Sequence, residues 1–526
     1  MNNPAFDEAV AERLTELGMG MAVLAATLGD TPAIITAEGT RSFNELNANA
    51  NRVARLFREH GLQPDDGVAV LTGNSIEMME TLYACYRAGF RMTPINWHLT
   101  DDEIAYIVNN CEAKALVVDA SRFGTAAITS VKESNHLALC LSTSGELQGF
   151  SDYNTKIKHY SGENIEDPVS GNIMLYTSGT TGRPKGVYRK KRPMASPLSE
   201  AINETSAFQP GVDVSLVTGP LYHSAPLSIN LGLPLAKGVT CVFMDKWDAE
   251  ETLRLIEKYK VTFSHMVPTM IQRILALPDD VKQQYDLSSF RYLIHGAAPC
   301  PVVVKQAAME FFGPIIHEYY AATEGGYVFS TPQDWLAHPG TVGKPAQDAE
   351  IKILDDDKQP VPVGSDGTVY FVAPEDKETQ FEYFRDSEKT AKTYVDNLFT
   401  MGDIGHVDEE GFLYLTGRSA ELVICGGVNV YPAQIDEVLS RHSAIADVAT
   451  FGVDNEEFGE EIKAVIELNE GEQPTEEIRD SITAFIQEKL QGFMRPRSIE
   501  FIDEVPRSAG GKIKRRQLRE KFNGKH

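Results

Sequence analysis

The segment from Tyr176 to Val187, Tyr-Thr-Ser-Gly-Thr-Thr-Gly-Arg-Pro-Lys-Gly-Val, concentrates residue types that bind anions. Glycines allow successive backbone N–H groups to converge on one anion, hydroxyl groups add donors, and Lys185 adds positive charge. The segment is not a Walker P-loop, because Gly186 rather than Ser or Thr follows the lysine. It predicts a loop that binds a polyphosphate, although taken alone it could equally be a polar surface loop.

Three other residues come directly after apolar runs typical of strands: His223, Gly296 and Tyr320. In open α/β sheets, ligands bind at the carboxyl ends of the strands. We therefore expect these segments, which are far apart in sequence, to meet the 176–187 loop at one cleft. Taken singly, each also has a structural interpretation as a residue of the core.

These motifs, in their order, resemble those of the adenylate-forming superfamily, which comprises acyl- and aryl-CoA synthetases, luciferases and nonribosomal adenylation domains. The resemblance extends from about residue 30 to Arg519. The motifs that carry it are the 176–187 loop, Leu221–Pro226, Gly296–Pro299, Tyr320–Glu324, Gly402–Asp403, Gly417–Arg418, Gly426–Pro432 and Pro506–Ile513. Chance agreement of so many motifs in order is negligible.

The resemblance implies a binding site for ATP and Mg²⁺. Its residues are Thr177, Ser178, Gly179, Thr180, Thr181, Gly182 and Lys185 at the phosphates, Gly296, Ala297, Ala298 and Tyr320 at the adenine, and Asp403 and Arg418 at the ribose. A carboxylate such as Asp403 can accept both ribose hydroxyls. Thr323 is expected at the α-phosphate, and Glu324 is expected to hold Mg²⁺, which prefers oxygen ligands.

The resemblance also implies catalytic roles for Lys512 and His223. Lys512 follows Gly510 and Gly511, and it is expected to bridge the substrate carboxylate and the α-phosphate. The basic residues behind it, Lys514, Arg515, Arg516 and Arg519, are interpreted mainly as a solvated tail. His223 is expected at the carboxylate end of the acyl pocket. The implied reaction forms an acyl-AMP and pyrophosphate, after which a thiol displaces AMP.

Coenzyme A is the implied thiol, and Gly426 and Gly427 are expected to line its pantetheine channel after the small domain has swung. The hinge departs from the family pattern, because Ala420 stands where relatives usually have Asp or Lys, with Glu421 next. The basic run 189–192 is a second departure. It is interpreted as a solvated charge run in preference to a contact with the 3′-phosphate of CoA.

The acid is expected to be hydrophobic. The expected pocket residues are His223, Ser224, Ala225, Ala321, Gly325 and Gly326. Residues 221–227 contain no carboxylate to pair with a substrate ammonium, which disfavours amino acids. Ala321 stands where acetate-specific relatives have Trp, so the pocket has room for a medium or long acyl chain or a bulky cyclic acid.

Two other functions are considered beside the favoured acid–CoA ligase. One is an acyl-AMP ligase that loads a separate carrier protein. The other is a non-catalytic nucleotide-binding relative, which the presence of Lys512, Glu324 and Asp403 disfavours.

The elements expected to position these residues are alternating strands and helices, which predict an α/β fold with helix-covered sheets. Residues 42–61 read as a capped helix, followed by a strand at 67–71 and a helix at 76–88. We expect a large N-terminal domain over 1–418, with a β-rich subdomain at about 340–418. Residues 419–526 are expected to form a small, mobile α+β domain with strands at 446–453, 461–468 and 498–501 and a helix at 475–490.

Composition limits the partners. The 526-residue chain has 49 Lys and Arg against 75 Asp and Glu, a formal charge of −26, which disfavours broad binding to nucleic acid or anionic lipid. The six cysteines form no CxxC pair, and no uninterrupted apolar run approaches eighteen residues. We expect a cytoplasmic enzyme without an integral membrane segment, acting on a small carboxylic acid; a homodimer is compatible with these features.

Overall fold

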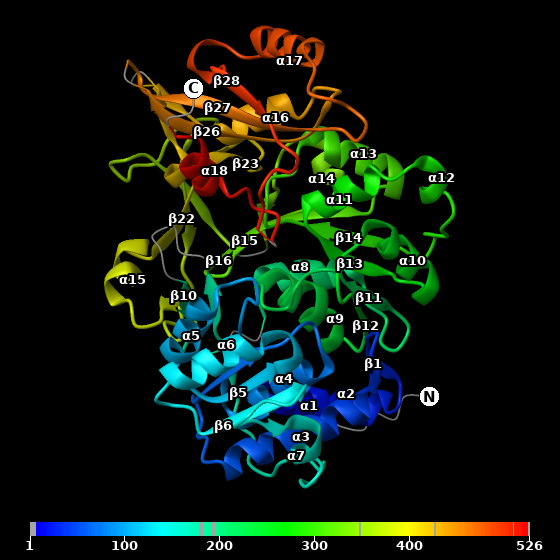
Figure 1. The fold of residues 1–526 in the computed structure, drawn as a ribbon. Coiled ribbons are helices and arrows are strands. Elements are labelled where there is room, and N and C mark those ends of the chain that lie inside the picture. Colours follow the sequence, from blue (N-terminus) through cyan, green and yellow to red (C-terminus); the bar gives the residue numbers. More distant parts are fainter. Residues whose placement is uncertain are drawn as a thin grey trace.

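A computed structural model describes residues 7–177, 184–191, 195–346, 349–425, 428–455, 457–508 and 510–523. A large N-terminal domain forms the lower and right-hand parts of Figure 1, and a small C-terminal domain, coloured orange to red, lies above it. Among the described residues, no helix has the length and apolar character needed to cross a bilayer. The mixed α/β fold predicted from the sequence is confirmed.

The first sheet is parallel, with strand order β7-β6-β5-β3-β4-β8. Alternate residues of its central strand face opposite ways. Val68 and Val70 pack with the helices α3 and α4, whereas Ala69 and Leu71 pack with α5 and α6. The sheet is therefore covered on both faces. Its elements are α3 (Phe43–Glu59), β3 (Gly67–Leu71), α4 (Ile76–Ala88), β4 (Arg91–Pro94), α5 (Asp101–Asn110), β5 (Ala113–Asp119), α6 (Ala120–Glu133), β6 (Leu139–Ser144), β7 (Ser151–Asp152), α7 (Tyr153–Ile157) and β8 (Asn172–Ile173).

The capping box predicted at the start of α3 is present, because Ser42 Oγ accepts from Glu45 N and the Glu45 carboxylate accepts from Ser42 N. These reciprocal bonds satisfy two backbone donors that a helix start otherwise leaves free.

The second sheet has nine strands in the order β17-β16-β15-β14-β13-β11-β12-β1-β2. Its centre is parallel, and the β1–β2, β15–β16 and β16–β17 pairs are antiparallel. Its strands are β1 (Pro32–Ile35), β2 (Thr40–Ser42), β11 (Val214–Val217), β12 (Thr240–Phe243), β13 (Phe263–Met266), β14 (Tyr292–His295), β15 (Ile316–Ala322), β16 (Gly325–Ser330) and β17 (Lys344–Pro345). The helical elements nearby are α1 (Glu8–Glu16), α2 (Gly20–Leu28), α8 (Pro197–Ser206), the π-helix η1 (Pro226–Gly232), α9 (Leu233–Ala236), α10 (Ala249–Tyr259), α11 (Pro268–Leu275), α12 (Asp279–Lys282), α13 (Val302–Phe312) and α14 (Pro332–Ala337).

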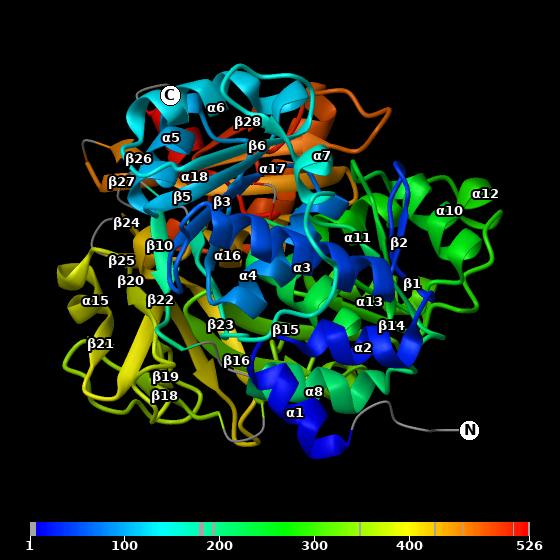
Figure 2. The same ribbon diagram turned by 90° about the horizontal axis from the view of Figure 1, so that it is seen from below.

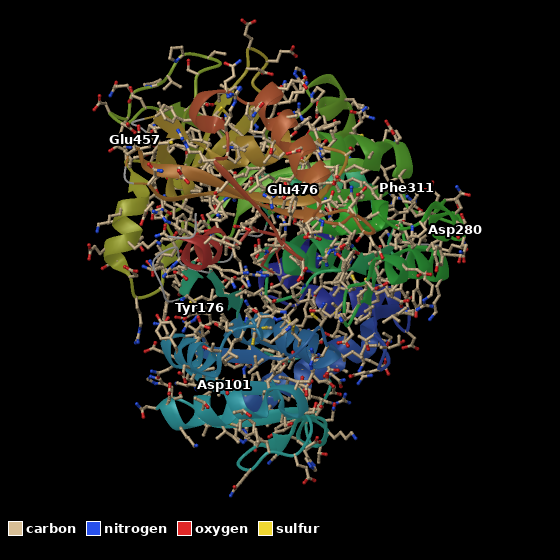
Figure 3. The ribbon with its side chains drawn as sticks, turned by 45° about the horizontal axis from the view of Figure 1, so that its top comes forward. Asp101, Tyr176, Asp280, Phe311, Glu457 and Glu476 are labelled. Carbon is tan, nitrogen blue, oxygen red and sulfur yellow. The ribbon has the colours of Figure 1, made fainter. Side chains whose placement is uncertain are left out.

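A β-rich part follows, seen at the left of Figure 1 and again from below in Figure 2. It comprises β18 (Ile351–Leu354), β19 (Gly367–Val372), α15 (Ser387–Thr393), β21 (Tyr394–Val395), β22 (Leu398–Val407) and β23 (Leu413–Arg418). A separate small sheet joins β9 (Leu175–Thr177), β10 (Lys185–Tyr188) and β20 (Glu382–Tyr383). Tyr176 of β9 donates a 2.6 Å hydrogen bond to Asn110 Oδ1 at the end of α5, the helix that begins at Asp101 (Figure 3).

The C-terminal domain has its own apolar core, centred on Ile435, Ile466 and Ile482. Its elements are β24 (Val423–Cys425), β25 (Val428–Val430), α16 (Pro432–Leu439), β26 (Ile445–Asn455), β27 (Gly459–Leu468), α17 (Glu476–Lys489), β28 (Ser498–Phe501) and α18 (Arg515–Phe522). The strands and the helix predicted for this part are confirmed.

The C-terminal domain contacts the N-terminal domain at α11 and α13. Gln272 Nε2 donates to the carbonyl of Ala446, and Arg273 pairs with Glu504 at 2.8 Å. Val302 N donates to Glu437 Oε1 at 3.3 Å. These contacts set the C-terminal loop 506–513 against the carboxyl ends of the nine-stranded sheet.

Candidate active site

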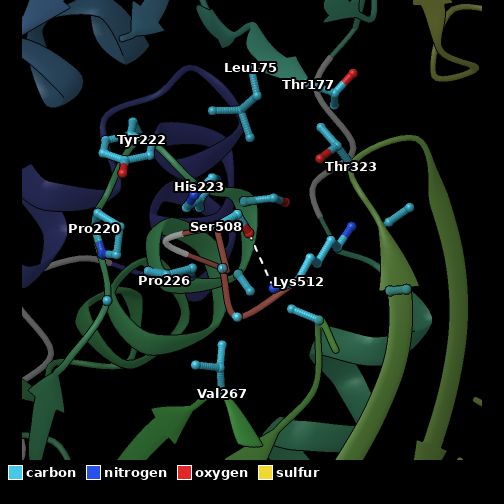
Figure 4. A pocket seen from close by; sticks show the side chains of 18 of the residues that line it. Leu175, Thr177, Pro220, Tyr222, His223, Pro226, Val267, Thr323, Ser508 and Lys512 are labelled. Carbon is cyan, nitrogen blue, oxygen red and sulfur yellow. Dashed lines mark hydrogen bonds between the residues drawn. The ribbon is translucent and has the colours of Figure 1, made fainter. Parts of the chain in front are cut away.

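A cavity of about 2680 Å³ lies between the two domains. Its lining includes ten of the residues singled out in the sequence: Thr177, His223, Ser224, Ala225, Ala297, Ala321, Thr323, Glu324, Arg418 and Lys512. In Figure 4 the side chain of Lys512 extends from the C-terminal loop toward Thr323, and His223 lies nearby. Among the described residues, each of these motifs contributes at least one lining residue except the segment at 426–432, whereas Gly296, Ala298, Tyr320, Asp403 and Lys185 do not themselves line the cavity.

Backbone geometry holds Lys512 in the cavity. Ser508 N donates to the Lys512 carbonyl at 2.8 Å, and Lys512 N donates to Ser508 Oγ at 3.2 Å. Gly511 has φ of +76°, and a Cβ at this position would lie 3.4 Å from Val267 and Thr269 of the N-terminal domain. A positive φ favours glycine, so the residue before the lysine allows both the turn and its close approach to the opposite wall.

The loop is fastened at its base by Arg507. Its guanidinium forms two bonds to Asp447 of β26, at 2.7 and 2.8 Å, and a third to the carbonyl of Gly511 at 2.6 Å. Bidentate pairs of this kind fix orientation as well as charge. Arg507 was not identified from the sequence as a functional residue; its place eight residues before α18 gave no sign of these partners.

The surroundings of the cavity lower the pKa values of both candidate catalytic groups, Lys512 and His223. The side chain of Lys512 is open to the water of the cleft but has protein on most sides. This desolvation, together with the charge of Arg418, lowers its pKa, while the carboxylates of Asp403 and Glu324 act in the opposite direction. Burial lowers the pKa of His223 to about 4, and the charge of Lys512 adds to the effect. At neutral pH the histidine is therefore a neutral imidazole.

Asp403 is held by two side chains from different strands. Tyr320 of β15 donates to Oδ2 at 2.6 Å, and Arg418 Nε of β23 donates to Oδ1 at 2.6 Å. Asp403 and Arg418 are paired across β22 and β23, so the ladder sets their spacing. Each carboxylate oxygen retains a second lone pair, which leaves acceptors for further hydroxyl groups.

The turn after β14 comes close to β15. A Cβ at Gly296 would lie 2.5 Å from the ring of Tyr319, so a larger residue cannot fit there. Ala297 has φ of +67°, a left-handed conformation that is uncommon outside glycine and is often found at functional sites. Ala297 lines the cavity; Ala298, the next residue, does not.

Glu324 lies in the turn between β15 and β16. Tyr383 of β20 donates to its Oε1 at 2.8 Å. Arg189 Nη2 donates to the carbonyls of Thr323 at 3.1 Å and Glu324 at 2.7 Å. This turn is therefore fixed by both a side-chain and a backbone contact.

A magnesium ion would fit this arrangement. The Glu324 carboxylate has lone pairs left after the bond from Tyr383, and Mg²⁺ is commonly bound by one or two carboxylates together with substrate phosphates. The described residues contain no group of three or more His, Cys, Asp or Glu placed to hold a metal. The other ligands of an ion at Glu324 would thus come from phosphate and water.

Thr177 and Lys185 face each other across the β9–β10 ladder, as the last described residue before the anion-binding loop and the second after it. Lys185 Nζ lies 3.7 Å from Asp386 Oδ2. The expected phosphate ligands Ser178, Gly179, Thr180, Thr181 and Gly182 lie outside the described residues, as do Gly426 and Gly427.

Comparison with known proteins also divides the chain into an N-terminal and a C-terminal part. Residues 22–375 match the AMP-binding enzyme family, and residues 434–512 match the AMP-binding enzyme C-terminal domain. The chain belongs to the AMP-binding enzyme family.

Relatives of this AMP-binding enzyme match it over nearly its whole length. Indoleacetate–CoA ligase of Aromatoleum aromaticum is 29% identical, over 93% of this chain and 94% of the relative. The fatty acid–[acyl-carrier-protein] ligase ScoC of Streptomyces coeruleorubidus is 29% identical, over 94% of each. The crystal structure of the anthranilate CoA ligase AuaEII with anthranoyl-AMP superposes with a TM-score of 0.86, at 25% identity and 97% coverage of both chains.

Two glycines expected in the acyl pocket are placed elsewhere in this AMP-binding enzyme. Gly325 and Gly326 have φ of +137° and +78°, and Cβ atoms there would meet Phe399 and Phe371 respectively. They are the first two residues of β16, directly after the Thr323–Glu324 turn, and do not line the cavity. The other expected pocket residues do line it.

Arg189 corrects the interpretation of its basic run. Lys190 and Lys191 are exposed, as expected for a solvated run, but Arg189 is half-buried and holds the Thr323–Glu324 turn. The available signal was the alternation of β10, since Arg189 falls on the face of buried Val187. Tyr383 was not predicted as a site residue, because no pattern in the sequence around it indicates a contact with Glu324.

Arg515 also departs from the solvated tail in which it was placed. It is largely covered, and it donates to Glu421 Oε2 at 3.0 Å, to Asp436 and to the carbonyl of Thr450. Glu421 directly follows Ala420, the residue at the hinge position. In this conformation the segment that joins the domains is thus tied to α18.

Proposed function

We propose that this protein is an AMP-forming acid–CoA ligase, which converts a carboxylic acid, ATP and CoA into an acyl-CoA, AMP and pyrophosphate. The observation that carries the proposal is the position of Lys512. Lys512 enters one cavity with Thr323, Glu324 and Arg418. About 90 residues of the chain, which belong to a domain with its own core, separate Lys512 from Arg418. All three substrates occur in the cytoplasm, where we place the enzyme.

In the first step, a carboxylate oxygen of the acid attacks the α-phosphorus of ATP, the bond to the β-phosphate oxygen breaks, and pyrophosphate leaves. Negative charge grows on the α-phosphate oxygens. Lys512 and the Thr323 hydroxyl stabilise it by placement alone, because donors fixed in a partly desolvated cleft need no rearrangement. Mg²⁺ bound at Glu324 would neutralise phosphate charge. Tyr383 and Arg189 keep Glu324 in place, and Asp403 accepts the ribose hydroxyls.

In the second step, the thiolate of CoA attacks the acyl carbonyl carbon and AMP departs with the electron pair of the broken C–O bond. We propose that Lys512 withdraws before this step, because its side chain occupies the cavity beside Thr323 and Glu324. We propose that the C-terminal domain rotates near Ala420 and brings Gly426 and Gly427 to the pantetheine channel. The contacts of Gln272, Arg273 and Val302 with the C-terminal domain are polar, which supports such a motion.

The acid is hydrophobic under this proposal. Ala225, Ala321 and the adjoining η1 offer apolar wall, and small residues at positions 225 and 321 leave room for a medium or long chain or a bulky ring system. His223 is neutral at physiological pH, so it borders the carboxylate end of the pocket without adding a charge there.

A second acceptor deserves a direct test, because the carrier-protein ligase ScoC is as similar to this chain as indoleacetate–CoA ligase is. Acid-dependent pyrophosphate release should be measured with free CoA, with a phosphopantetheinylated carrier protein, and with neither. Thioester on CoA supports the proposal, and thioester on the carrier alone would replace it with an acyl-AMP ligase. Absence of pyrophosphate release with every acid would show a non-catalytic nucleotide-binding protein.

A further inference from the structure

The cavity does not end at the acyl pocket. Beyond Ala225 and Ala321 it continues to the N-terminal helix α2, which lies close to α9 in the fold (Figure 1). Four elements wall this extension, hereafter the α2 channel: α2, the end of α4, α8, and η1 with α9. Its lining residues include Gly20, Met21, Leu24, Tyr83, Tyr86, Leu198, Ile202, Ser228, Leu233 and Ala236.

The wall of the α2 channel is apolar for most of its course. Leu198 and Ile202 of α8 pack in one cluster with Ala225 and Ala321 of the acyl pocket. Leu24 of α2 packs in the neighbouring cluster with Leu227 and Leu231 of η1. The two clusters meet along η1, so apolar side chains line much of the way from the acyl pocket to α2, with Asn203, Ser228 and Lys237 as polar members of the lining.

The π-helix separates the lining from the core. In η1, Leu231 is buried and does not line the cavity, whereas Leu227, also buried, and the exposed Ser228 both line it. A π-turn is wider than an α-turn, and such turns are uncommon outside functional sites. On the opposite wall, Gly20 contributes no side chain. The channel is thus kept open from both sides.

We infer that the α2 channel binds the distal part of the substrate acid, and that the acid is therefore an elongated apolar one, either a long acyl chain or a fused-ring system, rather than a short or single-ring acid. The inference rests on the proposed function. Burial of each further methylene group in an apolar site favours binding by about fourfold, so a chain that reaches α2 gains affinity unavailable to a short acid.

The test narrows the channel from each wall. Leu24→Trp fills it from α2, and Ala236→Trp fills it from α9. Ala26→Trp is the matched control, because Ala26 is an exposed residue of α2 that does not line the cavity. Pyrophosphate release is measured with hexanoate, benzoate, hexadecanoate and 5β-cholanate, the last two separating a chain from fused rings.

We expect the wild type to prefer hexadecanoate or 5β-cholanate to hexanoate. Both channel variants should lose at least about tenfold in kcat/KM for the preferred acid and stay within about twofold for hexanoate, while the control matches the wild type. Calorimetric binding of acyl-sulfamoyl adenosines gives a readout independent of turnover: a hexadecanoyl or cholanoyl analogue should weaken in the variants, and an acetyl analogue should not.

Equal losses for short and elongated acids, or a wild type that prefers hexanoate or benzoate, would overturn the channel while leaving the ligase intact. Failure of every acid to release pyrophosphate would instead overturn the proposed function. Agreement between variants on two separate helices excludes local misfolding of α2 as the cause.

Discussion

Arg507 and Asp447 form a two-point ion pair, at 2.7 and 2.8 Å, that fastens the Lys512 loop to β26. Because the same guanidinium bonds to the Gly511 carbonyl, the position of the lysine depends on a residue that does not itself enter the phosphate site. Arg507 is thus a positioning residue for the first half-reaction.

Replacement of Arg507 by alanine should slow acyl-AMP formation by about 10- to 100-fold, since small displacements of a catalytic group cost this much. Arg507→Lys should recover only part, because an ammonium cannot make the bidentate pair. Single-turnover assays of each half-reaction are the measurement. Arg516→Ala is the control, because Arg516 is exposed and pairs with Glu520 along α18. Equal losses in adenylation and thiolysis would indicate a merely structural role.

Lys512→Ala should reduce acyl-AMP formation by about 100- to 1000-fold, the effect of losing one fixed stabilising group. Thiolysis of supplied acyl-AMP should remain within about threefold, because Lys512 has left the site by then. Lys514→Ala, two residues along and exposed, should affect neither step. A comparable loss in both half-reactions would refute the assignment of Lys512 to the first.

Tyr320→Phe removes the donor to Asp403 Oδ2 and keeps the ring. We expect KM for ATP to rise by about five- to tenfold with a smaller change in kcat, because the carboxylate loses one of the two bonds that orient it toward the ribose. Tyr285→Phe makes the same chemical change at an exposed bond to Glu250 and serves as control. An unaltered KM would place the ribose elsewhere.

The pH dependence of adenylation follows from two lowered pKa values. Lys512 must be protonated to act, and its pKa lies below the ordinary 10.5, so the rate should fall with rising pH earlier than for a typical lysine. His223, with a pKa of about 4, stays neutral above that value and should produce no inflection near pH 6.5. Rapid-quench rates between pH 5.5 and 10 test this, with far-UV circular dichroism to exclude alkaline unfolding. An acidic limb near 6.5 that disappears in His223→Asn would contradict it.

Ala321→Trp should shift preference toward short acids, because an indole at this wall of the acyl pocket blocks the way to the α2 channel. We expect kcat/KM for hexadecanoate to fall by about tenfold or more relative to acetate. An unchanged chain-length profile would remove Ala321 from the pocket.

Local patterns in the sequence were enough to predict those parts that depend on neighbouring residues. The α3 capping box, the strand at 67–71 and the C-terminal strands and helix were all predictable, because capping and hydrophobic periodicity act within a few residues. The convergence of His223 and Thr323 was also foreseeable, because each follows a strand of the nine-stranded sheet and strand ends meet at one edge of a sheet. Thr177 belongs to the separate sheet of β9, β10 and β20, and it reaches the same cavity only because the two sheets pack together.

Contacts between distant segments could be decided only by the tertiary structure. The residues around Arg189, Tyr383 and Arg507 in the chain do not indicate their partners. Arg189 contacts Thr323 and Glu324, Tyr383 contacts Glu324, and Arg507 contacts Asp447, and all of these partners are distant in sequence. The same holds for the α2 channel, whose walls belong to helices near residues 20, 200 and 230. Short-range order is encoded residue by residue, whereas the depth of a cavity and the partners of a buried charge depend on how whole layers pack.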